Sequence, residues 1–324
     1  VTSVQASLGQ VPDDGGARST KINPTVSQDH IKSYIDLGFD VAEKVFANTT
    51  LRSKVFGACS TSATIPATCI DTYLSGFATN IFRRPLTADE KTKAKAIAVG
   101  SATQQEALTN VLALHLSSPQ FLIRWEMGDG AEAGSVFKLS NYEIASRISY
   151  SLTDSTPDTA LLALAAAGKL SDRQILLKEA TRLATSERGK YKIRQMFYGW
   201  LEFKEDFDYS NLGTAFIGGV NTSGLASASL SEVDEFLNYV IFEQKGSYKD
   251  LMTSKLSFAK HSGLAAIYGH APVTSTPAVM TGGRQGILSR LSYLYSSTTR
   301  SNIIIRGVTF RRHVLCQNLP SPSA

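Results

Sequence analysis

Three features that often reveal function are scarce in this chain: histidine, cysteine and long apolar runs. The 324 residues include 5 histidines and 3 cysteines, so few side chains are available as metal ligands or acid–base catalysts. No apolar run approaches the ~18 residues that a membrane-spanning helix needs, which excludes a transmembrane protein. No pattern sets a nucleophile beside a base, so the residues alone assign no reaction.

The charge balance is only mildly basic. The chain has 33 Lys and Arg against 28 Asp and Glu, a net charge of +5 without a polybasic block. Such an excess is typical of a solvated surface, and no aromatic and basic motif accompanies it, so we expect no nucleic-acid partner. Hydrophobic residues make up 43% and charged residues 19% of the chain, which indicates a globular protein of one extended or two smaller helical domains.

Helical signals dominate from Thr25 onward. Ser140 and Glu143 form a capping box, and Ile144, Ile148 and Leu152 then repeat along one face of a helix.

Similar caps are predicted elsewhere, at Thr25 with Gln28, at Thr87 with Glu90 and at Ser171 with Gln174. The predicted fold class is all-α, with a loop-rich C-terminal part and at most a few short strands, for which 136–139 and 303–305 are the best candidates.

Composition divides the chain into three predicted parts. A loop rich in glycine and acidic residues, 128–135, separates an N-terminal helical region, 1–134, from a helical core, 135–229. A second stretch rich in Gly, Ser, Asn and Thr, 205–229, precedes a helical and loop-rich C-terminal region, 230–324.

Several segments resemble a series of bacterial domains of unknown function. The segment 139–170 resembles DUF1592; the segments 81–90 and 116–126 resemble its companion DUF1595, expected from about residue 66. Gly286–Leu288 and Val314–Gln317 resemble DUF1588. Such proteins are abundant in planctomycetes and in predatory and fruiting delta-type bacteria.

The resemblance also implies a partner. In longer relatives a proline-rich linker and a segment with a Cys-x-x-Cys-His haem attachment site follow this series. That motif is absent here, so we expect no cofactor within this chain and place the c-type haem in a downstream segment.

Cys59 and Cys69 bracket a short Ser, Thr and Pro loop just before a predicted helix, and we expect a disulfide between them. Such a bridge, together with a first residue, Val1, that is not methionine, favours a periplasmic or extracellular bacterial protein, either processed or part of a longer polypeptide. Cys316 is left over, either free or paired elsewhere.

Two groups of residues are candidate sites. His261 and His270 flank a short predicted helix and could face one metal or haem edge, while His313 lies near Cys316; surface or interface histidines are the alternative. The second group could form a surface for an anion or a partner, or could simply hold backbone carbonyls; its members are Arg284, Arg300, Arg306, Arg311 and Arg312.

Two side-chain pairs have simpler interpretations. Glu232 and Glu235 could offer paired carboxylates for acid–base catalysis, but their spacing is also that of a solvent-exposed (wet) helix face. Arg83 and Arg84 precede a proline, and we expect them to satisfy helix-end carbonyls or to pair with a carboxylate.

These observations leave three functional hypotheses. The first is an exported helical accessory module that docks a protein partner, foremost the downstream haem segment. The second is a periplasmic or extracellular enzyme acting on polymers, with its site around His261, His270, Arg284 and Arg300. The third is a structural subunit of a surface assembly.

Overall fold

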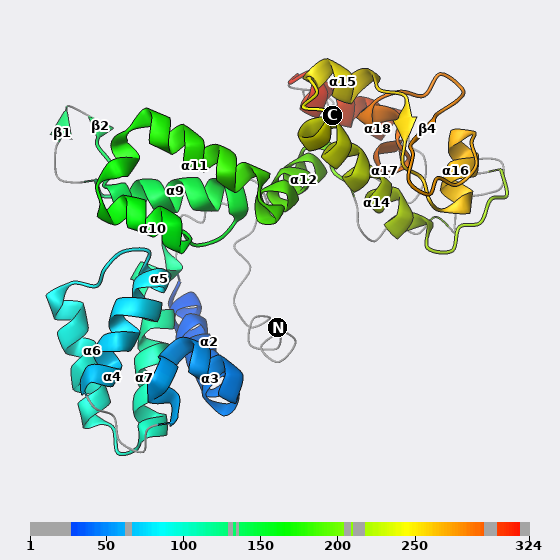
Figure 1. The fold of residues 1–324 in the computed structure, drawn as a ribbon. Coiled ribbons are helices and arrows are strands. Elements are labelled where there is room, and N and C mark those ends of the chain that lie inside the picture. The colour runs from blue at the N-terminus through cyan, green and yellow to red at the C-terminus, as the bar shows by residue number, and fades with distance from the viewer. Residues whose placement is uncertain are drawn as a thin grey trace, which may run out of the picture. The chain divides into compact units, whose positions relative to one another are not determined.

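The computed structural model describes residues 27–61, 67–128, 132–133, 136–203, 209, 218–294 and 303–317. The chain divides into two compact units, Val1–Ala184 and Thr185–Ala324. Helices dominate both units, and the described strands form only two short antiparallel pairs, which confirms the mainly helical fold (Figure 1). The expected boundaries near residues 134 and 229 stay a prediction.

The first unit begins with a helical group that is coloured blue to cyan in Figure 1. Its α-helices are α2 (Gln28–Ala47), α3 (Thr49–Phe56), α4 (Ala67–Tyr73), α5 (Thr79–Phe82), α6 (Ala88–Gly100), α7 (Gln104–Leu116) and α8 (Pro119–Leu122). A 3₁₀ turn, η2 (Gly57–Thr61), and a π-helical turn, η3 (Leu74–Ala78), complete it. Helices α2 and α6 both pack against α7.

Helix α7 is the centre of this group because it is buried on most of its sides. Leu108, Val111 and Leu112 are at most 1% exposed. His115 is also buried, and its Nδ1 donates to the Val111 carbonyl at 2.6 Å. Burial lowers the pKa of His115, so its ring packs beside Tyr73 as a neutral, core side chain.

Two of the predicted capping boxes are confirmed, one at Thr87 with Glu90 and one at Ser140 with Glu143. The cap of α2 is instead Ser27, whose hydroxyl accepts from the backbone N–H of His30.

The cap predicted for Ser171 was also wrong. Ser171 ends a 3₁₀ turn, η4 (Lys169–Ser171), and the carboxylate of Asp172 accepts from the N–H groups of Gln174 and Ile175 instead.

The first unit continues with a hairpin and a second helical group. Strands β1 (Glu132–Ala133) and β2 (Val136–Phe137) pair antiparallel, with Ala133 opposite Val136. Helices α9 (Asn141–Thr153), α10 (Thr159–Ala166) and α11 (Arg173–Thr185) follow. Their shared core includes Ala145, Leu161 and Leu183, while Ile144, Ile148 and Leu152 are only partly buried against it.

The second unit combines helices with short irregular turns. Its elements are α12 (Glu187–Leu201), α14 (Leu225–Leu237), π-helical η6 (Asn238–Glu243), α15 (Tyr248–Thr253), β3 (Leu256–Ser257), α16 (Ser262–Tyr268), β4 (Ala278–Val279), 3₁₀ η7 (Ile287–Ser289), α17 (Leu291–Leu294), α18 (Ile303–Thr309) and π-helical η8 (Phe310–Val314). The strand predicted at 303–305 was therefore wrong, since these residues begin α18.

A buried ion pair ties the second unit together. Arg290 is 0% and Glu232 is 2% exposed, and the guanidinium of Arg290 bonds to Oε1 of Glu232. The same guanidinium lies 3.5 Å from the Phe236 ring centroid and donates to the Leu256 carbonyl at 2.7 Å. The wet-face interpretation of Glu232 was thus wrong, while Glu235 does lie at the surface, 2.7 Å from Lys260.

Among the described helices, none combines the length and the apolar character needed to cross a membrane.

The expected disulfide is present. Cys59 and Cys69 are bonded with their Cα atoms 5.4 Å apart, and Cys316 is free and exposed. The bridge joins η2 to α4, and Nε2 of Gln104 donates to the Cys59 carbonyl at 2.8 Å. The disulfide therefore fastens η2 to α4, and the hydrogen bond from Gln104 fastens η2 to α7.

We predict that the double change Cys59→Ser and Cys69→Ser lowers the free energy of unfolding by about 2 to 3 kcal/mol, because a bridge across a short loop restricts the unfolded chain. Urea denaturation followed by circular dichroism measures the change. Cys316→Ser is the matched control and should leave the urea midpoint unchanged. Equal midpoints for the double variant and the control would contradict the prediction.

A second prediction concerns the buried ion pair. Arg290→Met should lower the free energy of unfolding by about 3 to 5 kcal/mol, because Glu232 is left charged and without its partner in the core. Adding Glu232→Gln in the same chain should recover part of this loss. Thermal unfolding of the two single variants and the double variant tests the coupling, and strictly additive effects would show that the pair does not act as a unit.

Candidate functional site

The histidines named from the sequence are bound to nearby backbone or carboxylate groups. His261 caps α16: its Nδ1 accepts from the N–H of Gly263 at 3.1 Å, and its Nε2 lies 2.8 Å from the Ser223 carbonyl. His270 follows the other end of this helix, about 10 Å away along its axis, and its Nδ1 lies 2.7 Å from the Ala271 carbonyl. Both rings thus have local structural contacts.

His313 belongs to a different cluster. Its Nε2 lies 3.1 Å from Oε1 of Glu202, and its carbonyl accepts from the indole N–H of Trp200 at 2.6 Å. Among the described residues, no group of three or more His, Cys, Asp and Glu side chains could hold a metal ion.

The candidate arginines are distributed over the second unit. The guanidinium of Arg284 lies 5.9 Å from the Tyr268 ring centroid and donates to the Ser289 carbonyl at 3.3 Å. Arg306 lies on α18, and Arg311 and Arg312 lie on η8. Arg300 lies outside the described residues.

Arg311 donates to Gln317 at 2.7 Å, and Arg312 is exposed. The loop that contains Gly282, Gly283 and Gly286 precedes η7, and the N–H of Gly286 donates to the Ser254 carbonyl at 2.7 Å. A three-residue 3₁₀ turn follows it, so no α-helix begins there.

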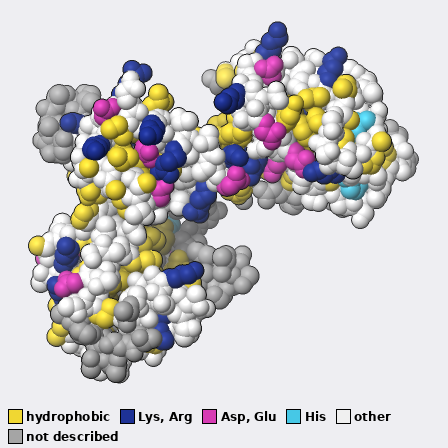
Figure 2. All heavy atoms as spheres, viewed as in Figure 1, with side chains coloured by type: hydrophobic (Ala, Val, Ile, Leu, Met, Phe, Trp, Pro, Cys, Tyr) yellow, Lys and Arg dark blue, Asp and Glu magenta, His cyan; other side chains and the backbone are white. Residues whose placement is uncertain are grey.

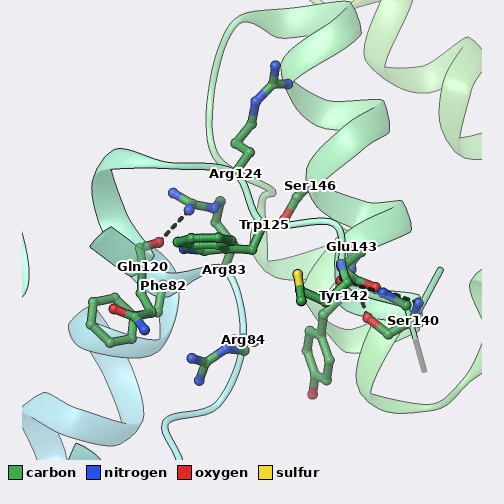
Figure 3. Close-up of a pocket in the computed structure, with 12 residues that line it drawn as sticks. Phe82, Arg83, Arg84, Gln120, Arg124, Trp125, Ser140, Tyr142, Glu143 and Ser146 are labelled. Atoms are coloured by element: carbon green, nitrogen blue, oxygen red, sulfur yellow. Dashed lines mark hydrogen bonds between the residues drawn. The ribbon is translucent and has the colours of Figure 1, made fainter. Parts of the chain in front are cut away.

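One cavity lies in the first unit, where the end of α5, helix α8 with the segment after it, and the start of α9 converge (Figure 3). It is an open pocket of about 490 Å³. The residues that line it are Phe82, Arg83, Arg84, Gln120, Arg124, Trp125, Met127, Gly128, Ser140, Tyr142, Glu143 and Ser146. We refer to it as the junction pocket.

Arg83 builds one wall of the junction pocket. It is 5% exposed, and its guanidinium donates to the carbonyls of Ile81, Gln120, Phe121 and Ile123. Such a fork satisfies carbonyls that a short helix leaves without partners. The structural role expected for Arg83 is confirmed.

Glu143 builds the opposite wall. Beyond its capping box, its carboxylate accepts from the backbone N–H groups of Met127 at 2.6 Å and Gly128 at 3.1 Å. Burial alone would raise the pKa of Glu143, but the hydrogen bonds from Ser140, Met127 and Gly128 outweigh it and lower this pKa. The capping residue of α9 therefore also fixes the path of the segment that carries Trp125.

Arg84 lies at the edge of the pocket. Its two terminal nitrogens bond to the Glu90 carboxylate at 2.9 and 2.7 Å, as expected from the sequence. The hydrogen bonds from Arg84 lower the pKa of Glu90 to about 2. Figure 3 shows Arg84, Trp125 and Tyr142 around an open space, with Arg124 pointing away from them.

A second hollow on the first unit is almost entirely apolar. It is a groove of about 520 Å³ on α9 and α11, and Leu177 in it is 65% exposed. The residues that line it are Leu139, Ile144, Arg147, Ile148, Ser151, Arg173, Leu176, Leu177 and Ala180. We call it the α9–α11 groove; Figure 2 shows apolar and basic side chains interspersed over this part of the molecule.

Family comparisons identify the segments that build both hollows. Residues 139–270 match the family of proteins of unknown function DUF1592. Residues 69–126 match the protein family of unknown function DUF1595. These matches confirm two of the three resemblances, while DUF1588 and a planctomycete origin stay predictions. No curated protein and no solved structure matches this chain.

The junction pocket lies where the DUF1595 and DUF1592 segments meet. Its lining residues from Phe82 to Trp125 belong to the first segment and those from Ser140 to Ser146 to the second. Only Met127 and Gly128 lie between them. Trp125 is not among the candidate residues predicted from the sequence; the available signal was a tryptophan placed after a helix that ends at Ser-Pro, outside any apolar stripe.

We predict that Glu143→Gln lowers the free energy of unfolding at pH 7 by about 1 to 2 kcal/mol, because a neutral amide replaces a carboxylate that accepts several backbone bonds. The native protein should lose this contribution as the pH falls through the lowered pKa of Glu143, so the difference between variant and native protein should shrink toward pH 3.

Urea midpoints at pH 7 and pH 3 measure this difference. Glu187→Gln removes the same charge from a side chain that is 88% exposed and should change neither midpoint appreciably. A Glu143→Gln effect that stays constant with pH would contradict the assigned role of the carboxylate.

Proposed function

We propose that this chain is a non-catalytic helical module that docks a partner protein, and that the α9–α11 groove is its docking site. The observation that carries the proposal is an apolar surface left open between α9 and α11. Leu177 is 65% exposed, although its neighbours on α11 contribute to a buried core. Exposed apolar surface of this kind is characteristic of binding sites.

The shape and charge of the groove favour a helical partner. Two helices supply its apolar floor, and its charged lining residues, Arg147 and Arg173, are both basic. An amphipathic helix lays its apolar face into such a groove with anchors at i, i+3, i+4 and i+7. Acidic residues beside those anchors would pair with Arg173 and with the exposed Arg147, whose guanidinium also lies 3.3 Å from Glu126, so the proposed occupant is an amphipathic helix with acidic flanks.

The source of this helix is proposed to be the haem-bearing segment that follows this series of domains in longer relatives. The Cys59–Cys69 disulfide supports an exported protein, because such bridges persist in oxidising compartments. A helical module without a haem attachment site of its own would then position a redox segment in the periplasm or outside the cell.

The test uses a fluorescent model helix with leucines at i, i+3, i+4 and i+7 and glutamates on either side. We expect it to bind the chain, and we expect Leu177→Asp to weaken binding at least tenfold, because a carboxylate would be buried against the apolar face. Fluorescence anisotropy measures the affinity. Val99→Asp, at a position that is 85% exposed on α6, is the matched control and should bind as the native chain does.

A helix with lysines in place of the glutamates separates charge from apolar burial. It should bind more weakly than the acidic helix. The two helices should bind with equal affinity to the double variant that carries both Arg147→Ala and Arg173→Ala. Equal binding of both helices, or binding that Leu177→Asp leaves unchanged, would refute the groove as the docking site. For the haem partner, the intact polypeptide should show a Soret band, and its absence would refute this choice of partner.

A further inference from the structure

We propose that the junction pocket is a second binding site, which takes a glycan containing uronic acid. This site is separate from the α9–α11 groove and does not depend on the docking function. It is built from both matched segments, and its ligand class follows from three properties: an open aromatic face, unpartnered hydroxyl groups and a basic lining.

The aromatic face is that of Trp125. The residue is 48% exposed, and its indole N–H donates to the Pro119 carbonyl at 3.2 Å. This bond holds the ring in place and leaves its face free to stack. Because Arg83 and Glu143 fix the chain on either side, the ring is presented from a rigid wall. A pyranose ring has one apolar C–H face that matches an indole face, and stacking there buries apolar area on both.

The hydroxyl groups belong to Tyr142 and Ser146, two residues of α9 that line the pocket. Tyr142 extends from α9 with its hydroxyl pointing away from Glu143 (Figure 3). Neither this hydroxyl nor that of Ser146 bonds to another described residue, although both residues line the pocket. A hydroxyl both donates and accepts, as the hydroxyls on the edge of a sugar do. The pocket thus combines an apolar platform with polar groups of the kind that orient a ligand.

The charge of the lining selects an acidic sugar. Three arginines and one glutamate line the pocket, and the carboxylate of Glu143 is already engaged by three backbone N–H groups. Arg83 is bound to four carbonyls and Arg124 points away from the open space, so Arg84 is the arginine proposed to meet the ligand. Arg84 bonds to Glu90 through its two terminal nitrogens, which leaves its Nε–H without a described partner at the pocket edge. A guanidinium edge is suited to a carboxylate. The volume, about 490 Å³, lies within the range of small-ligand sites.

The test measures binding of galacturonic acid trisaccharide to the whole chain by isothermal titration calorimetry, with the neutral galactose trisaccharide as the comparison ligand. We expect the acidic trisaccharide to bind at least tenfold more tightly than the neutral one. Trp125→Ala should weaken its binding at least tenfold, and Tyr142→Phe should weaken it severalfold by removing one hydroxyl. Since Trp125 is half exposed, circular dichroism should show both variants folded.

Two control variants make the result specific. Tyr248→Ala removes an aromatic side chain that is 60% exposed in the second unit, and Leu177→Asp alters the α9–α11 groove; neither should change the affinity for the acidic trisaccharide. No binding of the acidic trisaccharide, equal binding of the neutral one, or binding unaffected by Trp125→Ala would each overturn the proposal. Failure here leaves the helix-docking test untouched, because different residues carry it.

Discussion

The first unit depends on side chains that form hydrogen bonds to the free backbone carbonyl and N–H groups at the ends of its helices. Short helices such as α5 and α8 leave carbonyl and N–H groups that their own hydrogen bonds cannot reach. Arg83 collects four of these carbonyls with one buried guanidinium, and Glu143 collects three N–H groups with one carboxylate. Arg83 binds the carbonyls of Gln120, Phe121 and Ile123, and Glu143 binds the N–H groups of Met127 and Gly128, so the two residues fix the chain on either side of Trp125.

The same part of the first unit carries both proposed sites. Because Arg83 and Glu143 form hydrogen bonds to the backbone, the junction pocket keeps a rigid wall, and Trp125 is exposed on that wall. A few residues away, the face of α9 that carries Ile144 and Ile148 is covered only in part, which creates the α9–α11 groove. The same helix therefore contributes its first turn to one hollow and its apolar stripe to the other.

In the second unit several charged and titratable side chains are bound to partners within the fold. Glu232 and Arg290 neutralise each other in the core, His261 caps a helix, and His313 contacts Glu202. Each of these contacts brings together residues that are distant in the sequence or joined by a turn. Residue types that often act in catalysis, here Glu232, His261 and His313, therefore have structural partners in the fold.

The sequence by itself determined the local elements: the capping boxes at Thr87 and Ser140, the helical class, the Cys59–Cys69 bridge and the role of Arg84. These follow from interactions between residues close in the chain, which composition and spacing reveal. Only the tertiary structure decided that Glu232 is buried and that Trp125 is exposed beside a pocket. Burial depends on which distant elements pack against a residue, and no local pattern in one sequence specifies that.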